Sequence, residues 1–102
     1  MKKMDMEEEF TIMDKGWISD LVNYLAGKID DGVRLFVQII HLGYNTKKNE
    51  TWVSHFTKPT QNDELLTHLF DCDTMGWNVK QAKSWEDHGV LIVVIELERD
   101  NT

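Results

Sequence analysis

His68 and Cys72 are the two residues of this chain whose types and spacing best fit a chemical role. They lie four residues apart, and Cys72 is the only cysteine. In a helix this spacing places both side chains on one face. Imidazole nitrogen and thiolate sulfur are both good zinc ligands, so the pair could form half of a tetrahedral site. The spacing therefore predicts a structural zinc site, provided that further ligands come from elsewhere in the chain.

The nearest further histidines in the sequence are His55 and His41. Both fall in segments that resemble the two strands of a hairpin. A register that sets residue 41 opposite residue 55 places both imidazoles on one face, and a shift of one residue separates them. The sequence leaves this register open. The predicted zinc ligands are His41, His55, His68 and Cys72.

The same residues also have an explanation without metal. A lone cysteine on the apolar stripe of a helix is commonly a small buried hydrophobe, and a histidine beside it commonly lies at the edge of the core. The chain lacks the paired Cys-x-x-Cys of most zinc knuckles. Asp71 and Asp73 flank the thiol and could add an oxygen ligand or a hydrogen bond.

Two segments carry apolar residues at the spacing of an amphipathic helix. The stripe of the first consists of Ile18, Leu21, Val22, Leu25 and Ile29. The stripe of the second, which follows Pro59, consists of Leu65, His68, Leu69 and Cys72. The second helix is thus the element that would hold the histidine and cysteine pair.

Four further segments are typical of β-strands, because β-branched and aromatic residues are frequent in them and polar turns separate them. They are residues 33–42, 52–56, 75–85 and 90–97. The first two would form one hairpin and the last two another, with the second helix between them. Because hairpins pair locally, this αββαββ order predicts an α+β fold with a mostly antiparallel four-stranded sheet and both helices on one face.

Length and composition fit one folded domain. The chain has 102 residues, of which 41% are hydrophobic, enough to bury roughly two-thirds of its unfolded surface. Residues 1–10 lack periodicity and are predicted to be a flexible acidic arm, and residues 11–102 a single domain. The longest apolar run, residues 90–95, is far shorter than the ~20 residues of a membrane helix. With no secretory leader visible, we expect a cytoplasmic protein without a membrane anchor.

Charge and motifs narrow the classes of function. The formal charge is −7, from 18 acidic and 11 basic side chains, which disfavours direct binding to nucleic acid or anionic lipid. The same charge favours encounter with a basic protein surface. The sequence contains no nucleophile elbow, phosphate loop, dinucleotide fingerprint or zinc hydrolase motif. We therefore expect a protein that is not an enzyme.

Acidic and aromatic residues near the end of the chain form the predicted partner-binding surface. They are Trp85, Glu86, Asp87, Glu96, Glu98 and Asp100. Trp85 stands next to a predicted turn, on the same side of its strand as Trp77, and tryptophan is enriched at binding hot spots. The last three acidic residues alternate, so on a strand they would form a row with ~6.6 Å spacing. An ordinary solvated face would show the same row.

In its overall character, small and acidic with recognition residues and no catalytic motif, the chain resembles the inhibitors that phages encode against bacterial defence enzymes. Anti-CRISPR proteins that block Cas9 belong to this group. The resemblance covers no specific residue. It implies a stoichiometric inhibitor that docks on the basic, nucleic-acid-binding surface of a defence nuclease such as Cas9 and stops DNA loading or cleavage. The alternative is a small zinc-stabilised regulatory or oligomerisation domain.

Overall fold

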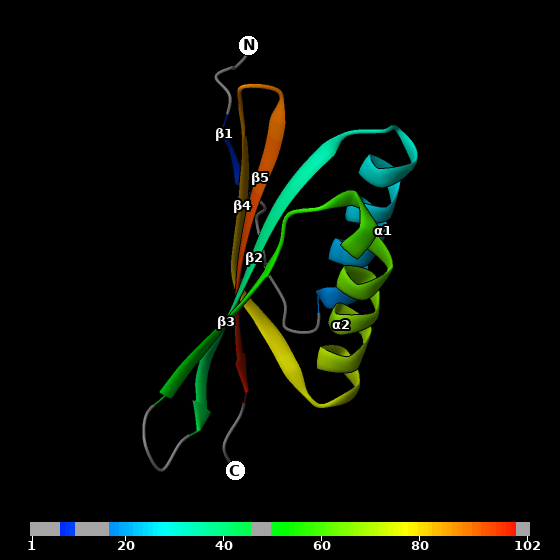
Figure 1. The fold of residues 1–102 in the computed structure, drawn as a ribbon. Coiled ribbons are helices and arrows are strands. Elements are labelled where there is room, and N and C mark those ends of the chain that lie inside the picture. The colour runs from blue at the N-terminus through cyan, green and yellow to red at the C-terminus, as the bar shows by residue number, and fades with distance from the viewer. Residues whose placement is uncertain (1–6, 10–16, 46–49, 100–102) are drawn as a thin grey trace.

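The protein folds into two layers, a sheet and a pair of helices that cover one of its faces (Figure 1). The computed structural model describes residues 7–9, 17–45 and 50–99. Helix α1 spans Ile18–Asp30 and helix α2 spans Asn62–Thr74, and a short 3-10 turn at Pro59–Gln61 leads into α2. The predicted α+β class and the αββαββ order of the main elements are confirmed.

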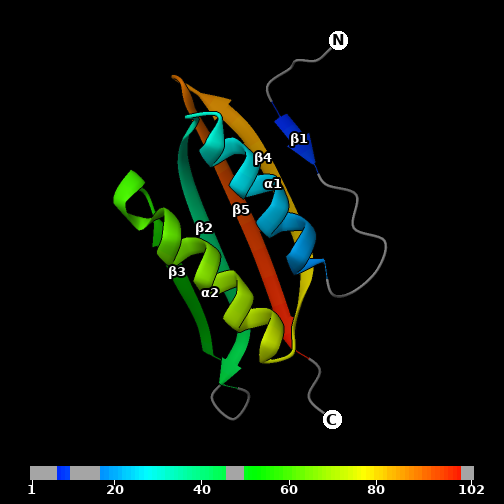
Figure 2. The same ribbon diagram turned by 90° about the vertical axis from the view of Figure 1, so that its right-hand side faces the viewer.

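The sheet has the strand order β1-β4-β5-β2-β3. Its strands are β1 (Glu7–Glu9), β2 (Arg34–Asn45), β3 (Glu50–Phe56), β4 (Trp77–Asp87) and β5 (Val90–Arg99). Both predicted hairpins form, and β1 also pairs antiparallel with β4. The two hairpins join through β2 and β5, which are parallel, so the sheet is mixed and not wholly antiparallel. The chain returns from β3 to β4 through α2, which makes this parallel pairing geometrically accessible (Figure 2).

Strand β1 lies within the segment predicted to be a flexible arm. Its three residues pair with the edge of β4, with Glu8 opposite Ser84. Strand pairing uses backbone groups and does not depend on side-chain type. Three glutamates show no alternation of apolar and polar residues, so nothing in the sequence indicates this strand. The rest of the predicted arm, residues 1–6 and 10, lies outside the described residues.

The core lies between the helices and the sheet, and alternation along each strand decides which side chains enter it. On β5 the buried residues are Leu91, Val93, Ile95 and Leu97. They pair with residues 35, 37, 39 and 41 of β2, which therefore face the helices as well. From the helices, the buried residues are Ile18, Leu21, Val22, Leu25, Leu65, Leu69 and Cys72. Both predicted helical stripes thus point at the sheet, and Cys72 points with them.

The β4–β5 hairpin turns through His88 and Gly89, which both have positive φ angles, 54° and 81°. Two such residues in succession fit the tight turn that matches the twist of paired strands. No helix within the described ranges is long and apolar enough to cross a membrane.

Candidate metal centre

Three of the four predicted zinc ligands meet between the sheet and helix α2. His41 comes from β2, and His68 and Cys72 come from α2. One ligand atom from each of the three residues lies within 4.8 Å of the others. His41 Nε2 lies 3.4 Å from Cys72 Sγ, and the rings of His41 and His68 meet edge to face with centroids 5.2 Å apart.

The alternation of β2 is what places His41 there. Val37, Ile39 and His41 share the face of β2 that points at the helices, and each is at most 2% exposed. Leu97 of β5 pairs with His41 on one side. A polar side chain thus stands in a row of core hydrophobes, where it costs free energy unless its nitrogens find partners.

Aromatic side chains surround the cluster. The ring of His41 lies 4.9 Å from that of Trp77 and 5.5 Å from that of Trp52, centroid to centroid. The ring of Phe56 lies 5.6 Å from that of His68. Trp77 is buried, whereas Trp52, on the outer strand β3, is 49% exposed. These rings limit the access of water and lower the local dielectric around the three ligand atoms.

The dimensions of the cluster fit zinc for one pair of ligands and are slightly wide for the third. Zinc bonds of ~2.0 Å to nitrogen and ~2.3 Å to sulfur in a tetrahedron hold the two ligand atoms about 3.5 Å apart. The 3.4 Å between His41 Nε2 and Cys72 Sγ matches this separation. The 4.8 Å limit for the whole group means that the third ligand would have to move in by about 1 Å. Rotation of the His68 side chain supplies such a movement, since it is only partly buried.

The protonation states also suit a metal. Burial lowers the pKa of His41, and the neighbouring imidazole of His68 lowers it further. Burial lowers the pKa of His68 too, against an opposing effect of the Asp71 carboxylate. Both imidazoles are therefore neutral at pH 7, the form that binds metal ions. Burial, with Asp71 adding to it, raises the pKa of the Cys72 thiol to about 11, so the thiol keeps its proton unless a cation displaces it.

One atom of the cluster lacks a partner. The Nε2 atom of His68 is buried and has no hydrogen-bond partner among the described residues. A buried nitrogen without a partner costs roughly 1 to 3 kcal/mol, so such atoms are rare in folded proteins. A metal ion held among the three ligand atoms would remove this cost. The explanation without metal leaves a weak contact between His41 and Cys72 and does not account for His68 Nε2.

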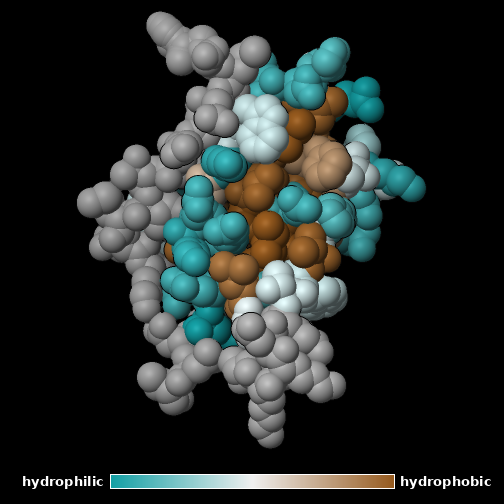
Figure 3. Space-filling view, turned by 90° about the vertical axis from the view of Figure 1, so that its left-hand side faces the viewer, coloured by the Kyte–Doolittle hydropathy of each residue, from teal (hydrophilic) through white to brown (hydrophobic). Residues whose placement is uncertain are grey.

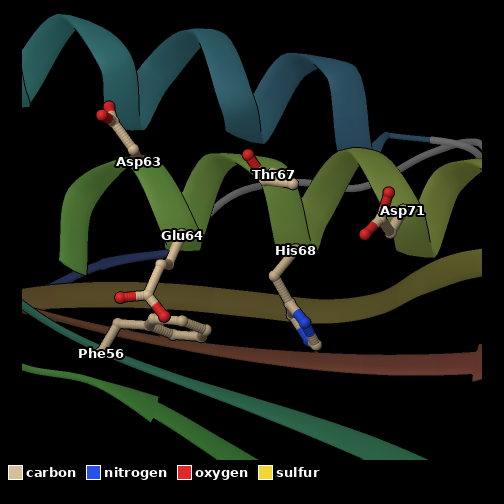
Figure 4. A pocket seen from close by; sticks show the side chains of 6 residues that line it. All are labelled: Phe56, Asp63, Glu64, Thr67, His68 and Asp71. Atoms are coloured by element: carbon tan, nitrogen blue, oxygen red, sulfur yellow. The ribbon is translucent and has the colours of Figure 1, made fainter.

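A pocket of about 430 Å³ opens beside His68. Its lining residues are Phe56, Asp63, Glu64, Thr67, His68 and Asp71. Figure 4 shows His68 pointing from α2 towards the sheet, with the three carboxylates spread along the helix on either side of it. Carboxylates at the mouth of a pocket attract cations. The pocket thus brings His68 and the Asp71 carboxylate to one acidic hollow beside the cluster.

The structure separates His55 from the other predicted ligands. Residue 41 pairs with Trp52, and residue 55 pairs with Gln38. His55 therefore shares a face of the sheet with its partner Gln38. Gln38 and His41 are three residues apart on β2, so their side chains, and hence His41 and His55, lie on opposite faces. The Nε2 atom of His55 lies 3.1 Å from Nε2 of Gln38, an amide that can donate to it. The ligand set that the fold brings together is His41, His68 and Cys72.

The predicted partner-binding residues divide between the two faces of the sheet. We call the face away from the helices the open face (Figure 3). Glu96 and Glu98 lie on it, because Leu97 between them faces the helices and is buried. Trp85 and Asp87 lie on it as well, because they pair with Ile92 and Val90, which flank buried Leu91. Glu86 pairs with buried Leu91 and lies on the helix side, where it is exposed. Asp100 lies outside the described residues.

Sequence reasoning did not single out two contributors to these sites. Trp52 and Trp77 flank the imidazole of His41, although neither was connected with the metal ligands. Their signal is weak, because an aromatic residue on a strand is equally typical of an ordinary core. Comparisons of the whole chain with protein-family models, with curated proteins and with solved structures found no match.

Proposed function

We propose that this chain is a small non-catalytic domain, regulatory or oligomerising, whose fold is stabilised by a zinc ion bound to His41, His68 and Cys72. The observation that carries the proposal is the meeting of three ligand atoms from two layers within 4.8 Å. The unpartnered Nε2 of His68 supports it further. Two nitrogens and one sulfur are a ligand set that zinc binds well.

The ion would link the two layers of the fold. His41 belongs to β2, an inner strand of the sheet, whereas His68 and Cys72 belong to α2, which packs over the sheet. A preformed site rarely exists in an unfolded chain, so the free energy of metal binding becomes free energy of folding. The role would be structural, with Asp71 or a water molecule as the fourth ligand.

Metal content tests the proposal directly. We expect untagged protein, purified without chelator and dialysed against micromolar zinc, to retain about one equivalent of zinc by elemental analysis. Cys72→Ser and His41→Ala should each retain less than about a tenth of an equivalent, because two remaining ligands bind zinc weakly. His55→Ala is the matched control, since His55 lies on the other face of the sheet. Wild-type protein without zinc, or zinc that survives Cys72→Ser, would contradict the proposal.

A second candidate function is that of a stoichiometric inhibitor that docks on a basic protein surface. The position of Trp85, Asp87, Glu96 and Glu98 on one open face favours it. An aromatic anchor with carboxylates around it suits a cationic partner. The partner would be a nucleic-acid-binding defence protein, such as the nuclease Cas9, whose DNA loading or cleavage would be blocked.

Salt dependence tests this second candidate. Binding to such a nuclease, measured by calorimetry, should weaken about tenfold or more between 0.05 and 0.5 M salt, because screening reduces steered association. Glu96→Lys should weaken it at low salt, whereas Asp20→Lys, an exposed charge change on α1, should not. Absence of binding at low salt to a panel of such nucleases would rule the inhibitor out.

A further inference from the structure

The candidate metal centre contains three ligands within the part of the chain that the structure describes. One atom each from His41, His68 and Cys72 lies within 4.8 Å of the others, and no fourth described residue belongs to this group. Asp71 is exposed, and in Figure 4 its carboxylate stays beside α2 while the imidazole of His68 reaches towards the strands. Structural zinc sites are almost always tetrahedral, with four ligands. Zinc would therefore have to recruit a ligand from outside the group.

The surroundings of the three ligands are mainly apolar. His41 is 2% exposed and Cys72 is 4% exposed. The ring of Trp77 lies against that of His41, and the ring of Phe56 lies against that of His68. A buried water molecule that served as the fourth ligand would need roughly two to four polar partners. An ion that is satisfied by three ligands needs no such water.

The charge of the ligand set also distinguishes between the possible ions. Two neutral imidazoles and one thiolate carry a single negative charge in total. A monovalent cation therefore makes the centre neutral, whereas a divalent cation leaves one positive charge in excess. A net charge that is buried away from water costs free energy. The ligand set is thus balanced better by a monovalent ion than by a divalent one.

Two charged groups outside the ligand set have opposite signs. Burial and the Asp71 carboxylate both raise the pKa of Cys72. The guanidinium carbon of Arg99 lies 4.5 Å from the centroid of the Trp77 ring, and Arg99 adds to the lowering of the pKa of His41 that burial causes. Because these two groups oppose each other, the charge balance of the centre is set mainly by its own ligands.

We propose that His41, His68 and Cys72 hold a cuprous ion, Cu(I), in three-coordinate form, and that Cu(I) displaces zinc from them. Thiolate ligands favour Cu(I) over harder ions, and imidazole suits copper as well as zinc. Three ligands satisfy Cu(I), and its single charge balances that of the thiolate. The copper site rests on the ligand set of the proposed function, but the binding of Cu(I) and of zinc can be measured separately.

Displacement of zinc is the first test. The full chain, loaded with zinc, is titrated without oxygen with Cu(I) as its acetonitrile complex, and the zinc released through an ultrafiltration membrane is measured by elemental analysis. We expect about one equivalent of Cu(I) to release about one equivalent of zinc. X-ray absorption at the copper edge should then show two nitrogen ligands and one sulfur ligand.

The possible failures can be told apart. Zinc that stays bound in the presence of excess Cu(I), or a copper centre that has four ligands or lacks sulfur, would overturn the copper site and leave the proposed function intact. A chain that binds neither ion would overturn both. A chain that binds Cu(I) at three ligands and never binds zinc would overturn the proposed function alone.

Two charge changes test why the centre prefers a monovalent ion. Asp71→Asn should weaken zinc binding about threefold or more and leave Cu(I) binding within about twofold, because only the zinc centre carries excess positive charge. Arg99→Glu should strengthen zinc binding relative to Cu(I) binding by about three- to tenfold, for the same reason. Arg34→Glu is the matched control, because Arg34 is exposed at the start of β2 and lies on the other face of that strand from His41.

Competition with a chelator specific for each ion measures the two affinities, and circular dichroism verifies that each variant remains folded. Arg99→Glu also removes the contact with the ring of Trp77, so Asp71→Asn, at an exposed position, provides the independent reading. A ratio of zinc to Cu(I) affinity that is the same in the wild type, Asp71→Asn and Arg99→Glu would overturn the charge balance on which the copper site depends.

Discussion

Removal of zinc by a strong chelator is expected to lower the midpoint of thermal unfolding by roughly 15 to 30 °C. A ligand present at ~1,000 times its dissociation constant stabilises the folded state by about 4 kcal/mol. For a domain of about 100 residues, each kcal/mol corresponds to roughly 4 to 8 °C. Without the ion, the buried Nε2 atom of His68 would be left with no partner among the described residues. A buried nitrogen without a partner destabilises the folded state, which contributes to the lower midpoint.

The control for this experiment is Cys72→Ser. Without the thiolate the zinc affinity falls, so the midpoint of the variant should be low already and should not respond to the chelator. Serine at a position that is only 4% exposed brings its own cost, which is why the response to chelator and not the midpoint itself is compared. A wild-type midpoint that is the same with and without chelator would show that no ion stabilises the fold.

Two of the three ligands of the candidate metal centre could be placed together from the sequence alone, because their geometry is local. His68 and Cys72 lie on one helix, where a spacing of four residues places side chains together whatever the rest of the fold does. The choice between His41 and His55 depended on the register of the β2–β3 hairpin. The polar residues between the two strands fit turns of several lengths, and each change of one residue in the register exchanges the faces, so the sequence could not fix it. In the structure His41 pairs with Trp52, which leaves His55 on the other face.

The positions of the two tryptophans of β4 also depend on a register that the sequence does not reveal. Strict alternation predicts Trp77 and Trp85 on one side of the strand, together with Val79. In the structure the register of β4 shifts between Val79 and Gln81, so Trp77 is buried under the helices and Trp85 lies on the open face. A bulge adds one residue and exchanges the faces of everything beyond it. Trp85, predicted to belong to the partner-binding surface, is only partly exposed and lies on the other face of the sheet from Trp77. Its role in binding a partner stays a prediction.

The class of the fold was predictable, whereas the arrangement of its strands was not. Hydrophobic periodicity identifies the helices and the four long strands to within a few residues. It says nothing about which strands of two hairpins become neighbours, and here the parallel pair β2–β5 joins them. This pairing makes β2 an inner strand of the sheet, so that His41 is buried against α2, where it meets Cys72.

Zinc affinity is expected to fall more steeply with each pH unit as the solution becomes more acidic. The steepness gives the number of protons that zinc displaces from its ligands. Burial raises the pKa of Cys72 to about 11, so zinc must displace the thiol proton at every pH below that value. Affinity should therefore fall about tenfold for each pH unit between pH 8 and pH 7. The pKa values of His41 and His68 are lowered from 6.5, so their protons compete only in more acidic solution. There the fall should steepen towards about 1,000-fold per unit, one factor of ten for each ligand.

Competition titration with a chromophoric chelator, corrected for its own protonation, measures this profile. In Cys72→Ser the slope near pH 7.5 should vanish, because serine has no proton to release in this range. In His55→Ala the profile should match that of the wild type, since His55 lies on the far face of the sheet. Wild-type affinity that stays constant between pH 8 and pH 7 would mean that the thiol is no ligand. The contact between His41 and Cys72 would then be an ordinary polar contact within the core.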